Sequence, residues 1–168
     1  DAGYAMRELT FDDYTEPDML KPGTQAPSFT LPDADGEPVT LEDLIAEGPL
    51  VLYFYPADFT PGCTKEASAL RDIHDDLIAS GLRIVGVSPQ DGDSHQRFAA
   101  RHTLPFPLLS DPDKTAVRAY DVDGPLGFGV RRGTYLIDGD GVIVDAVMAD
   151  IAIARHLEFI ERAMVAQS

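Results

Sequence analysis

Residues 50–66, LVLYFYPADFTPGCTKE, contain the only cysteine of the 168-residue chain, Cys63. The first six residues of this segment are apolar or aromatic, and a run this short predicts a buried strand, which Pro56 ends. After a short loop, Thr60 and Pro61 supply a hydroxyl N-cap and a proline at the first helical position, the start signal of a helix. The sequence therefore places Cys63 in the first turn of a helix that follows a buried strand.

This position favours a reactive sulfur on Cys63. Unpaired backbone N–H groups and the positive end of the helix dipole both stabilise a thiolate relative to a thiol. The carboxyl end of a strand in an open α/β sheet is also where ligand crevices form. A lone cysteine is more often a small buried apolar residue, and this alternative stands beside the reactive one.

The spacing Pro56-x-x-x-Thr60-x-x-Cys63, extended by Tyr55 before it and by Glu66 after it, resembles the active-site signature of the peroxiredoxins. The extended form is most similar to the Q-type subfamily, also called bacterioferritin comigratory proteins. This resemblance covers about residues 21–165. It implies a thioredoxin-like fold and a thiol-dependent peroxidase that reduces hydrogen peroxide and organic hydroperoxides, with Cys63 oxidised to a sulfenic acid.

The resemblance also assigns roles near the sulfur. Cys63 is the peroxidatic cysteine, and Thr60 could hydrogen-bond either the sulfur or the peroxide. A plain N-cap is an equally good interpretation of Thr60, and it is compatible with the other role. Pro56 is expected to wall the pocket and shield the sulfur, although ending the strand explains it without any function.

An arginine is the expected electrostatic partner of the sulfur. The resemblance places it two residues before Thr134, which gives Arg132. Its neighbour Arg131 is the alternative, because an error of one residue would exchange their roles. Glu66 lies three residues after Cys63, and a carboxylate so close would raise the pKa of the thiol unless it is paired. We therefore expect Glu66 to form an ion pair with an arginine.

The main departure from the family pattern is at Ser68. Many Q-type members carry a second, resolving cysteine five residues after the first, and here serine occupies that place. Either the chain is a one-cysteine peroxiredoxin, or it is an engineered cysteine-to-serine variant, and the sequence leaves both open. In either case the expected partners are a hydroperoxide substrate and an external thiol reductant: thioredoxin, glutaredoxin or a low-molecular-weight thiol.

Predicted strands and helices alternate along the rest of the chain. Strands are expected at 29–31, 39–40, 50–55, 83–88, 108–109, the latter part of 130–138 and 142–144, and helices at 41 to about 48, 61 to about 80, 94 to about 101, 111 or 113 to about 120, and 151–165. The helix between 50–55 and 83–88 makes these strands parallel, whereas the last two strands form an antiparallel hairpin. The expected fold class is α/β, thioredoxin-like, with a central mixed sheet flanked by helices and an N-terminal β-hairpin.

Length and composition restrict the class of protein. A chain of 168 residues has room for one domain with a sizeable core. No apolar run reaches the roughly 20 residues needed to span a bilayer. The formal net charge of −16 repels phosphate backbones and anionic lipids, so no nucleic acid or membrane partner is expected. Residues 1–20 are interpreted as an N-terminal extension that could be mobile, and 21–168 as the single domain.

Nothing in the sequence indicates a cofactor or a metal. One cysteine excludes a cysteine-rich zinc site and an internal disulfide framework. The four histidines, at positions 74, 95, 102 and 156, show no ligand spacing and are expected at the surface. A cytoplasmic protein, monomeric or weakly dimeric, is the simplest expectation. No signal peptide is visible, but a cleaved one is left open, as is whether residues 1–6 are native.

Two other functions are compatible with this fold class. A thiol–disulfide exchange protein needs two sulfurs, and Cys63-Thr-Lys-Glu66 lacks the second cysteine of a Cys-x-x-Cys motif. A non-catalytic acidic binding domain with a degenerate site would show a cysteine that resists alkylation and no consumption of peroxide. The joint presence of Pro56, Thr60, Cys63 and Arg132 favours the peroxidase.

Overall fold

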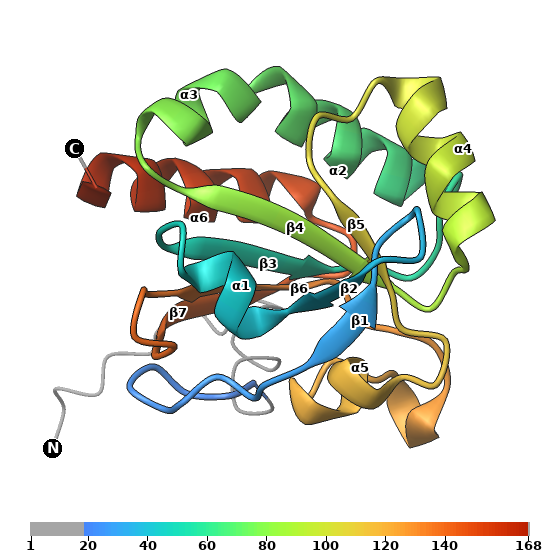
Figure 1. Ribbon diagram of the computed structural model, residues 1–168, viewed down its shortest axis with the longest axis horizontal. Helices are drawn as coiled ribbons and strands as arrows, with labels where there is room; N and C mark the ends of the chain where they lie inside the picture. The colour runs from blue at the N-terminus through green and yellow to red at the C-terminus, as the bar shows by residue number, and fades with distance from the viewer. Residues whose placement is uncertain (1–18, 168) are drawn as a thin grey trace, which may run out of the picture.

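Strands and helices alternate in the computed structural model, which describes residues 19–167 (Figure 1). The strands are β1 (Thr30–Pro32), β2 (Pro38–Thr40), β3 (Leu50–Phe54), β4 (Arg83–Ser88), β5 (Leu108–Ser110), β6 (Gly133–Ile137) and β7 (Ile143–Met148). The helices are α1 (Leu41–Ile45), α2 (Pro61–Asp72), α3 (His74–Ala79), α4 (Gly92–His102), α5 (Thr115–Ala119) and α6 (Ile153–Gln167), with a 3₁₀ turn η3 (Pro125–Gly127). Residues 1–18 of the predicted N-terminal extension lie outside the described residues.

The central sheet has five strands in the order β5-β4-β3-β6-β7. Strand β4 runs parallel to both β3 and β5, whereas β6 runs antiparallel to β3 and β7 antiparallel to β6. Strands β1 and β2 form a separate antiparallel pair. The predicted mixed sheet and N-terminal hairpin are thus confirmed, and the fold is the thioredoxin-like α/β fold.

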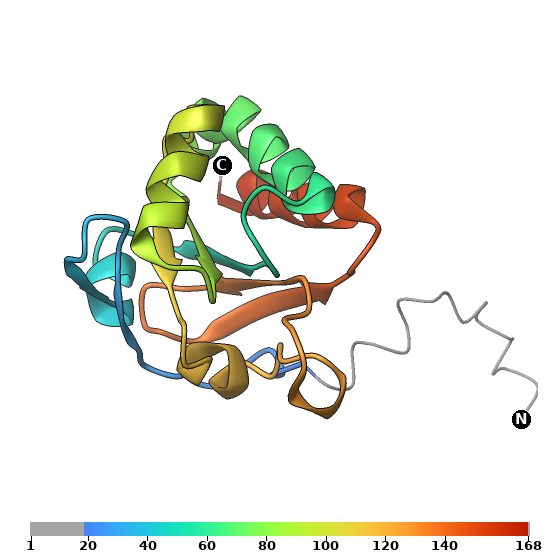
Figure 2. The ribbon, with the colours of Figure 1, turned by 90° about the vertical axis from the view of Figure 1, so that its right-hand side faces the viewer.

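Strand β3 separates two hydrophobic cores because its side chains alternate between the faces of the sheet. Leu50, Leu52 and Phe54 belong to one core, together with residues of α1 and α5, whereas Val51 and Tyr53 belong to the other. This second core also holds Cys63. Helices α2, α3, α4 and α6 cover that face, and α1 and α5 lie on the opposite side (Figures 1 and 2). All five strand residues are buried, which explains the unbroken apolar run in the sequence.

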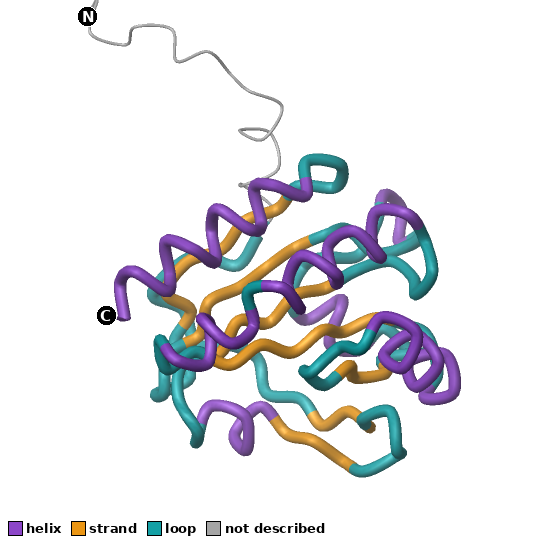
Figure 3. Tube along the Cα trace, turned by 90° about the horizontal axis from the view of Figure 1, so that it is seen from above, coloured by secondary structure: helices purple, strands orange, loops and turns teal. Residues whose placement is uncertain are grey.

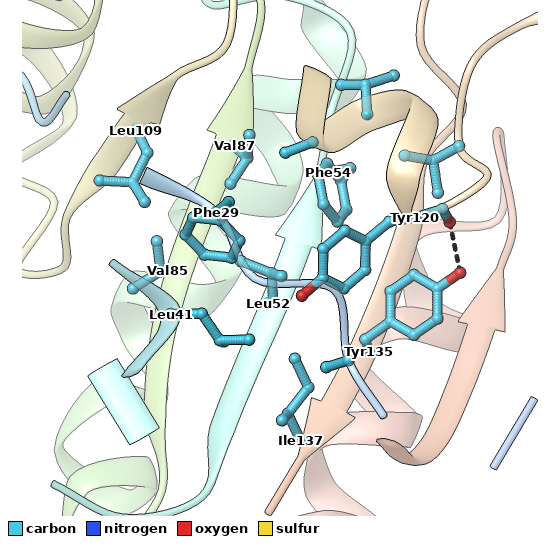
Figure 4. Packing of buried hydrophobic residues seen from close by; sticks show 14 of the residues in the cluster. Phe29, Leu41, Leu52, Phe54, Val85, Val87, Leu109, Tyr120, Tyr135 and Ile137 are labelled. Atoms are coloured by element: carbon cyan, nitrogen blue, oxygen red, sulfur yellow. Dashed lines mark hydrogen bonds between the residues drawn. The ribbon is translucent and has the colours of Figure 1, made fainter. Parts of the chain in front are cut away.

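An aromatic group lies under the carboxyl end of β3 (Figure 4). The ring of Phe54 packs against Tyr120 at a centroid distance of 5.3 Å and against Tyr135 at 6.5 Å. The Tyr135 hydroxyl donates a hydrogen bond to the Tyr120 carbonyl at 2.6 Å, and the Tyr120 hydroxyl donates to the Pro27 carbonyl at 2.7 Å. These contacts attach α5 and the segment before β1 to the sheet, below the point where the cysteine loop begins.

Helix boundaries differ from the prediction at several places. Helix α1 ends at Ile45 rather than near residue 48, and α5 begins at Thr115 rather than at residue 111 or 113. The expected helix 61–80 is interrupted at Ile73 (φ −100°, ψ 2°), which divides it into α2 and α3. Helix α4 begins earlier than predicted, because Asp91 rather than Ser94 is its N-cap and accepts from the Ser94 N–H at 2.8 Å. Helix α6 begins at Ile153, two residues later than expected, and it lies alongside α2 over the sheet (Figure 3).

The pairing of β3 with β6 determines which segment lies beside the loop that joins β3 to α2 and leads to Cys63. In this antiparallel register Phe54, the last residue of β3, lies opposite Gly133, the first residue of β6. The segment that follows β3 therefore lies beside the segment that precedes β6, although some seventy residues separate them in sequence. Within residues 19–167, no helix is long and apolar enough to cross a membrane.

Candidate active site

Cys63 lies in the first turn of α2, as predicted. The helix begins at Pro61, with Thr60 at the N-cap position in an extended conformation (φ −77°, ψ 150°). The Cys63 side chain is only 2% exposed, and it packs in the core that lies between the sheet and the helices. The sulfur thus combines burial with the unpaired N–H groups of a helix start, which favour a negative charge.

The guanidinium of Arg132 binds the sulfur and a carboxylate at the same time. Its Nη2 donates to Cys63 Sγ at 3.2 Å, and its Nη1 donates to Glu66 Oε1 at 2.7 Å. The predicted ion pair between Glu66 and an arginine is therefore confirmed. Burial alone would lower the pKa of Arg132, but the negative charges of Glu66 and Cys63 outweigh it and raise that pKa. The guanidinium consequently remains charged beside the sulfur.

Asp150 separates the two neighbouring arginines. Its Oδ2 accepts from Arg131 Nη2 at 3.0 Å, whereas its Oδ1 accepts from the backbone N–H of Arg132 at 3.0 Å. Arg131 is therefore turned toward the surface and Arg132 toward Cys63. A close approach at Gly62 also matters, because a Cβ atom there would lie 3.1 Å from Arg132 Nη2. Glycine at this position leaves room for the guanidinium, a constraint that the sequence did not reveal.

The other two predicted site residues, Thr60 and Pro56, lie in the loop before α2. The Thr60 hydroxyl donates to the Ala57 carbonyl at 2.9 Å, and it makes no side-chain cap bond. The expected hydroxyl cap is thus wrong, because the Thr60 oxygen accepts no backbone N–H of the first turn. The oxygen of Thr60 can still accept a hydrogen bond. Pro56 lies two residues after the end of β3 and is exposed.

A buried ion pair holds the same loop against α4 and β5. Asp58 accepts from the Tyr55 hydroxyl at 2.6 Å and from the Ser94 hydroxyl at 2.7 Å, and its Oδ2 lies 2.7 Å from His95 Nδ1. The other ring nitrogen of His95 lies 3.1 Å from the Leu109 carbonyl. The ring thus lies between the Asp58 carboxylate and the Leu109 carbonyl, with the Tyr55 hydroxyl 3.4 Å from Nδ1.

The prediction that all four histidines lie at the surface is wrong for two of them. His95 and His156 have no exposed area, whereas His74 and His102 are partly exposed. A buried histidine is tolerated where both ring nitrogens find partners, and these partners come from segments distant in sequence. Their spacing along the chain therefore gave no sign of burial.

Ser68 lies on α2, five residues after Cys63, and is partly buried. The chain has no further cysteine that could supply an internal partner for an oxidised Cys63. Arg132, Glu66 and Cys63 form one contiguous buried group, while Thr60 and Pro56 belong to the loop that leads into it. The arrangement can stabilise a thiolate and a second negative charge that develops next to it.

Comparison with known proteins agrees with this chemistry. The model of the AhpC/TSA family matches residues 22–146. The bcp protein of Coxiella burnetii, which carries a peroxiredoxin name, is 41% identical over 144 residues, covering 82% of this chain and 94% of its own. Peroxiredoxin Q from the chloroplast of Arabidopsis thaliana is 45% identical over 123 residues, covering 72% of this chain and 56% of its own.

Solved structures give the same result. Peroxidoxin BcpB from Mycobacterium tuberculosis has a TM-score of 0.82 at 35% identity, covering 88% of this chain and 97% of its own. The bacterioferritin comigratory protein of Xanthomonas campestris, described with an alkyl peroxide reduction activity, has a TM-score of 0.75 at 33% identity, covering 82% and 90%. The two alternative functions find no support in these relatives. The chain belongs to the AhpC/TSA family and is a peroxiredoxin, a thiol-dependent peroxidase with peroxiredoxin Q and bacterioferritin comigratory proteins among its relatives.

Proposed function

We propose that Cys63 is the nucleophile with which this peroxidase reduces hydrogen peroxide and organic hydroperoxides in a one-cysteine cycle. The observation that supports this most directly is the 3.2 Å contact between Cys63 Sγ and Arg132 Nη2, in the first turn of α2. A positive charge and a helix start acting on one buried sulfur favour the thiolate, which is the form that attacks. The alkyl peroxide reduction described for the Xanthomonas campestris relative supports including organic hydroperoxides.

The reaction divides into an oxidation and a reduction of the sulfur. The thiolate attacks the terminal oxygen of the hydroperoxide, an S–O bond forms and the O–O bond breaks, and the leaving alkoxide or hydroxide takes a proton to become an alcohol or water. Cys63 is then a sulfenic acid. An external thiol displaces water from it to give a mixed disulfide, and a second thiol releases Cys63 by thiol–disulfide exchange.

Three further residues assist the oxidation in this proposal. The charge of Arg132 stabilises first the thiolate and then the leaving oxygen, because it is fixed in a water-poor site before the reaction begins. The Thr60 hydroxyl donates its own proton to the Ala57 carbonyl. Its oxygen is therefore free to accept a hydrogen bond from the O–H of the peroxide. Pro56 shields the sulfur from bulk water without adding a backbone donor.

The reductant, the cellular location and the oligomeric state are proposed from the same family relationship. Thioredoxin, glutaredoxin or a small thiol supplies the electrons, and the protein acts as an antioxidant in the cytoplasm, as a monomer or weak dimer. Residues 21–168 form the single domain that carries the activity. Because the chain has one thiol, this external reduction is required whatever the origin of Ser68.

Intact-mass measurement before and after one equivalent of peroxide tests the nucleophile. We expect a gain of about 16 Da on the parent protein, for the sulfenic acid, and none on Cys63→Ser. The Cys63→Ser variant should keep its fold and lose peroxide consumption with a thiol donor, whereas the control Ser68→Ala should keep it. Peroxide consumption by Cys63→Ser at the parent rate would exclude Cys63 as the nucleophile.

A further inference from the structure

One oxygen of the buried carboxylate beside Cys63 is not accounted for by the ion pair. Glu66 is 1% exposed, and its Oε1 is bound by Arg132. Its Oε2 has no hydrogen-bond partner among the described residues, and it faces His156 Nδ1 at 3.9 Å. Burying a carboxylate oxygen without a hydrogen-bond donor costs free energy. The side chain that faces this oxygen is therefore a candidate for a proton that offsets the cost.

His156 can gain or lose a proton at the nitrogen that faces Glu66. Its Nε2 lies 2.8 Å from the Ala149 carbonyl, which only accepts, so Nε2 carries a proton. Its Nδ1 lies 2.8 Å from the Thr134 hydroxyl, which can donate or accept. The ring can therefore be neutral, with Thr134 as donor, or a cation with a proton on Nδ1. Rotation of one hydroxyl interconverts these states without moving the ring.

A charge balance shows what this proton can do. Cys63, Glu66, Arg132 and His156, here called the Cys63 cluster, are all at least 95% buried. Arg132 and Glu66 cancel each other, so the cluster is neutral while Cys63 is a thiol and His156 is neutral. A thiolate adds one uncompensated negative charge, which burial penalises. A proton on His156 Nδ1 makes the cluster neutral again.

The other titratable groups around the cluster do not provide this compensation. Burial, followed by the negative charges of the cluster, raises the pKa of Tyr53 well above its ordinary value, so that side chain stays neutral. Asp150 is exposed and bound by Arg131. Arg155 and Glu158, on α6 itself, lie one and two positions from His156 and do not share its face.

We propose that His156 is a positioning residue of the active site, whose proton on Nδ1, donated to the Thr134 hydroxyl and close to Glu66 Oε2, balances the charge of the Cys63 thiolate. This rests on the proposed role of Cys63 as nucleophile. One proton leaves the sulfur and one is held at the ring, so the buried cluster keeps the same net charge. His156 thereby makes the reactive form of Cys63 available at lower pH without contacting the sulfur.

Replacing the ring by an amide tests the effect on the sulfur. Glutamine at position 156 can still hydrogen-bond Ala149 and Thr134, but it cannot take up a proton. In His156→Gln we expect the pH at which the Cys63 alkylation rate is half-maximal to rise by about half a unit or more. Below that pH the alkylation rate should fall about threefold or more. The control His74→Gln, far from the cluster, should keep the parent midpoint.

The reciprocal measurement needs no change at His156. Coupling between two sites is mutual, so the thiolate must favour the His156 proton by the same factor. Nitrogen NMR of the ring should show that Nδ1 loses its proton at higher pH in the reduced parent than in Cys63→Ser, by a shift that matches the alkylation result. This comparison tests the coupling between His156 and Cys63 even if His156→Gln fails to fold.

Equal ring titration in the parent and in Cys63→Ser would overturn the proposal. So would a His156→Gln protein with the parent unfolding temperature and the parent alkylation midpoint. Either result, with peroxide consumption intact in the parent, would leave the function of Cys63 standing. Loss of the proposed function would look different, because the parent itself would then form no sulfenic acid.

Discussion

Arg131 and Arg132 are chemically identical neighbours, and only the three-dimensional structure separates their environments. Arg132 donates to Cys63 and Glu66 from a buried position, whereas Arg131 binds the exposed Asp150. We expect Arg132→Ala to lower kcat/KM for a hydroperoxide by roughly 10²–10³-fold, the usual cost of losing one donor to a developing charge. Arg131→Ala should stay within a few-fold of the parent in the same steady-state assay.

A structural loss must be distinguished from a catalytic one in this experiment. Arg132→Ala leaves Glu66 as an unpaired buried charge, which costs about 3–5 kcal/mol of stability. The double variant Arg132→Ala with Glu66→Gln removes that charge, so it should regain stability while kcat/KM stays as low as in Arg132→Ala. Equal losses of activity in Arg131→Ala and Arg132→Ala would show that the two roles are assigned to the wrong neighbours.

At the scale of single residues, the sequence predicted the chemical roles of side chains better than it predicted which side chains are buried. The motif from Pro56 to Cys63 placed the cysteine in the first turn of α2, and the spacing before Thr134 selected Arg132, the arginine that bonds the sulfur. Burial of His95 and His156 was missed, because their acceptors include Leu109 and Ala149 carbonyls on other segments. A single sequence contains no signal for such long-range partners.

The loop between β3 and α2 depends on one buried carboxylate. Burial alone would raise the pKa of Asp58, but hydrogen bonds from His95, Tyr55 and Ser94 outweigh it and lower that pKa below its ordinary 3.8. A carboxyl group whose pKa is lowered on folding stabilises the native state above its unfolded-state pKa. That contribution is lost as the pH falls through the lower, folded-state value.

Asp58→Asn should therefore destabilise the protein most at neutral pH. Removing one partner of a buried ion pair costs about 3–5 kcal/mol, and this difference from the parent should shrink as the pH falls below about 4. Urea unfolding at a series of pH values measures it. The same change at exposed Asp75, on α3, controls for the loss of one negative charge. A difference from the parent that does not change with pH would mean that Asp58 is not ionised in the folded loop.

At the scale of elements, the periodicity of apolar residues predicted which helices exist better than it predicted where each one begins and ends. The apolar repeat continues from α2 into α3, so the break at Ile73 was not visible in the sequence. Helix α1 begins at Leu41 as predicted, and its N-cap Thr40 accepts from the Asp43 N–H at 3.1 Å. In contrast, a helix was expected from Ser94, whereas α4 begins at Gly92 with Asp91 as its N-cap, because serine and aspartate are both good caps and lie three positions apart here.

At the scale of the whole molecule, the mixed sheet followed from connection lengths, but the order of its strands did not. The long helix α2 required β3 and β4 to be parallel, and the short turn after β6 required an antiparallel partner. Pairing of β3 with β6 joins distant segments, and no local pattern indicated it. That pairing is what brings Arg132 to Cys63, so the sequence supplied the members of the site but not their arrangement.

The fate of oxidised protein depends on the whole molecule. Cys63 is 2% exposed, and two copies that each carry a net charge of −16 repel each other. A disulfide between two copies would need their Cα atoms within roughly 4.4–6.8 Å, which requires both α2 first turns to unwind. With no internal thiol available, the sulfenic acid should persist until a small or protein thiol reaches it.

Oxidation without a donor should therefore leave the protein monomeric on non-reducing gels. Excess peroxide should then convert the sulfenic acid to sulfinic acid, a total gain of about 32 Da, because no competing thiol intercepts it. Adding a small thiol before the excess peroxide should instead trap a mixed disulfide at Cys63 and prevent that gain. A covalent dimer in high yield after one equivalent of peroxide would contradict the externally reduced cycle, since Cys63 of a second copy would then be the resolving thiol.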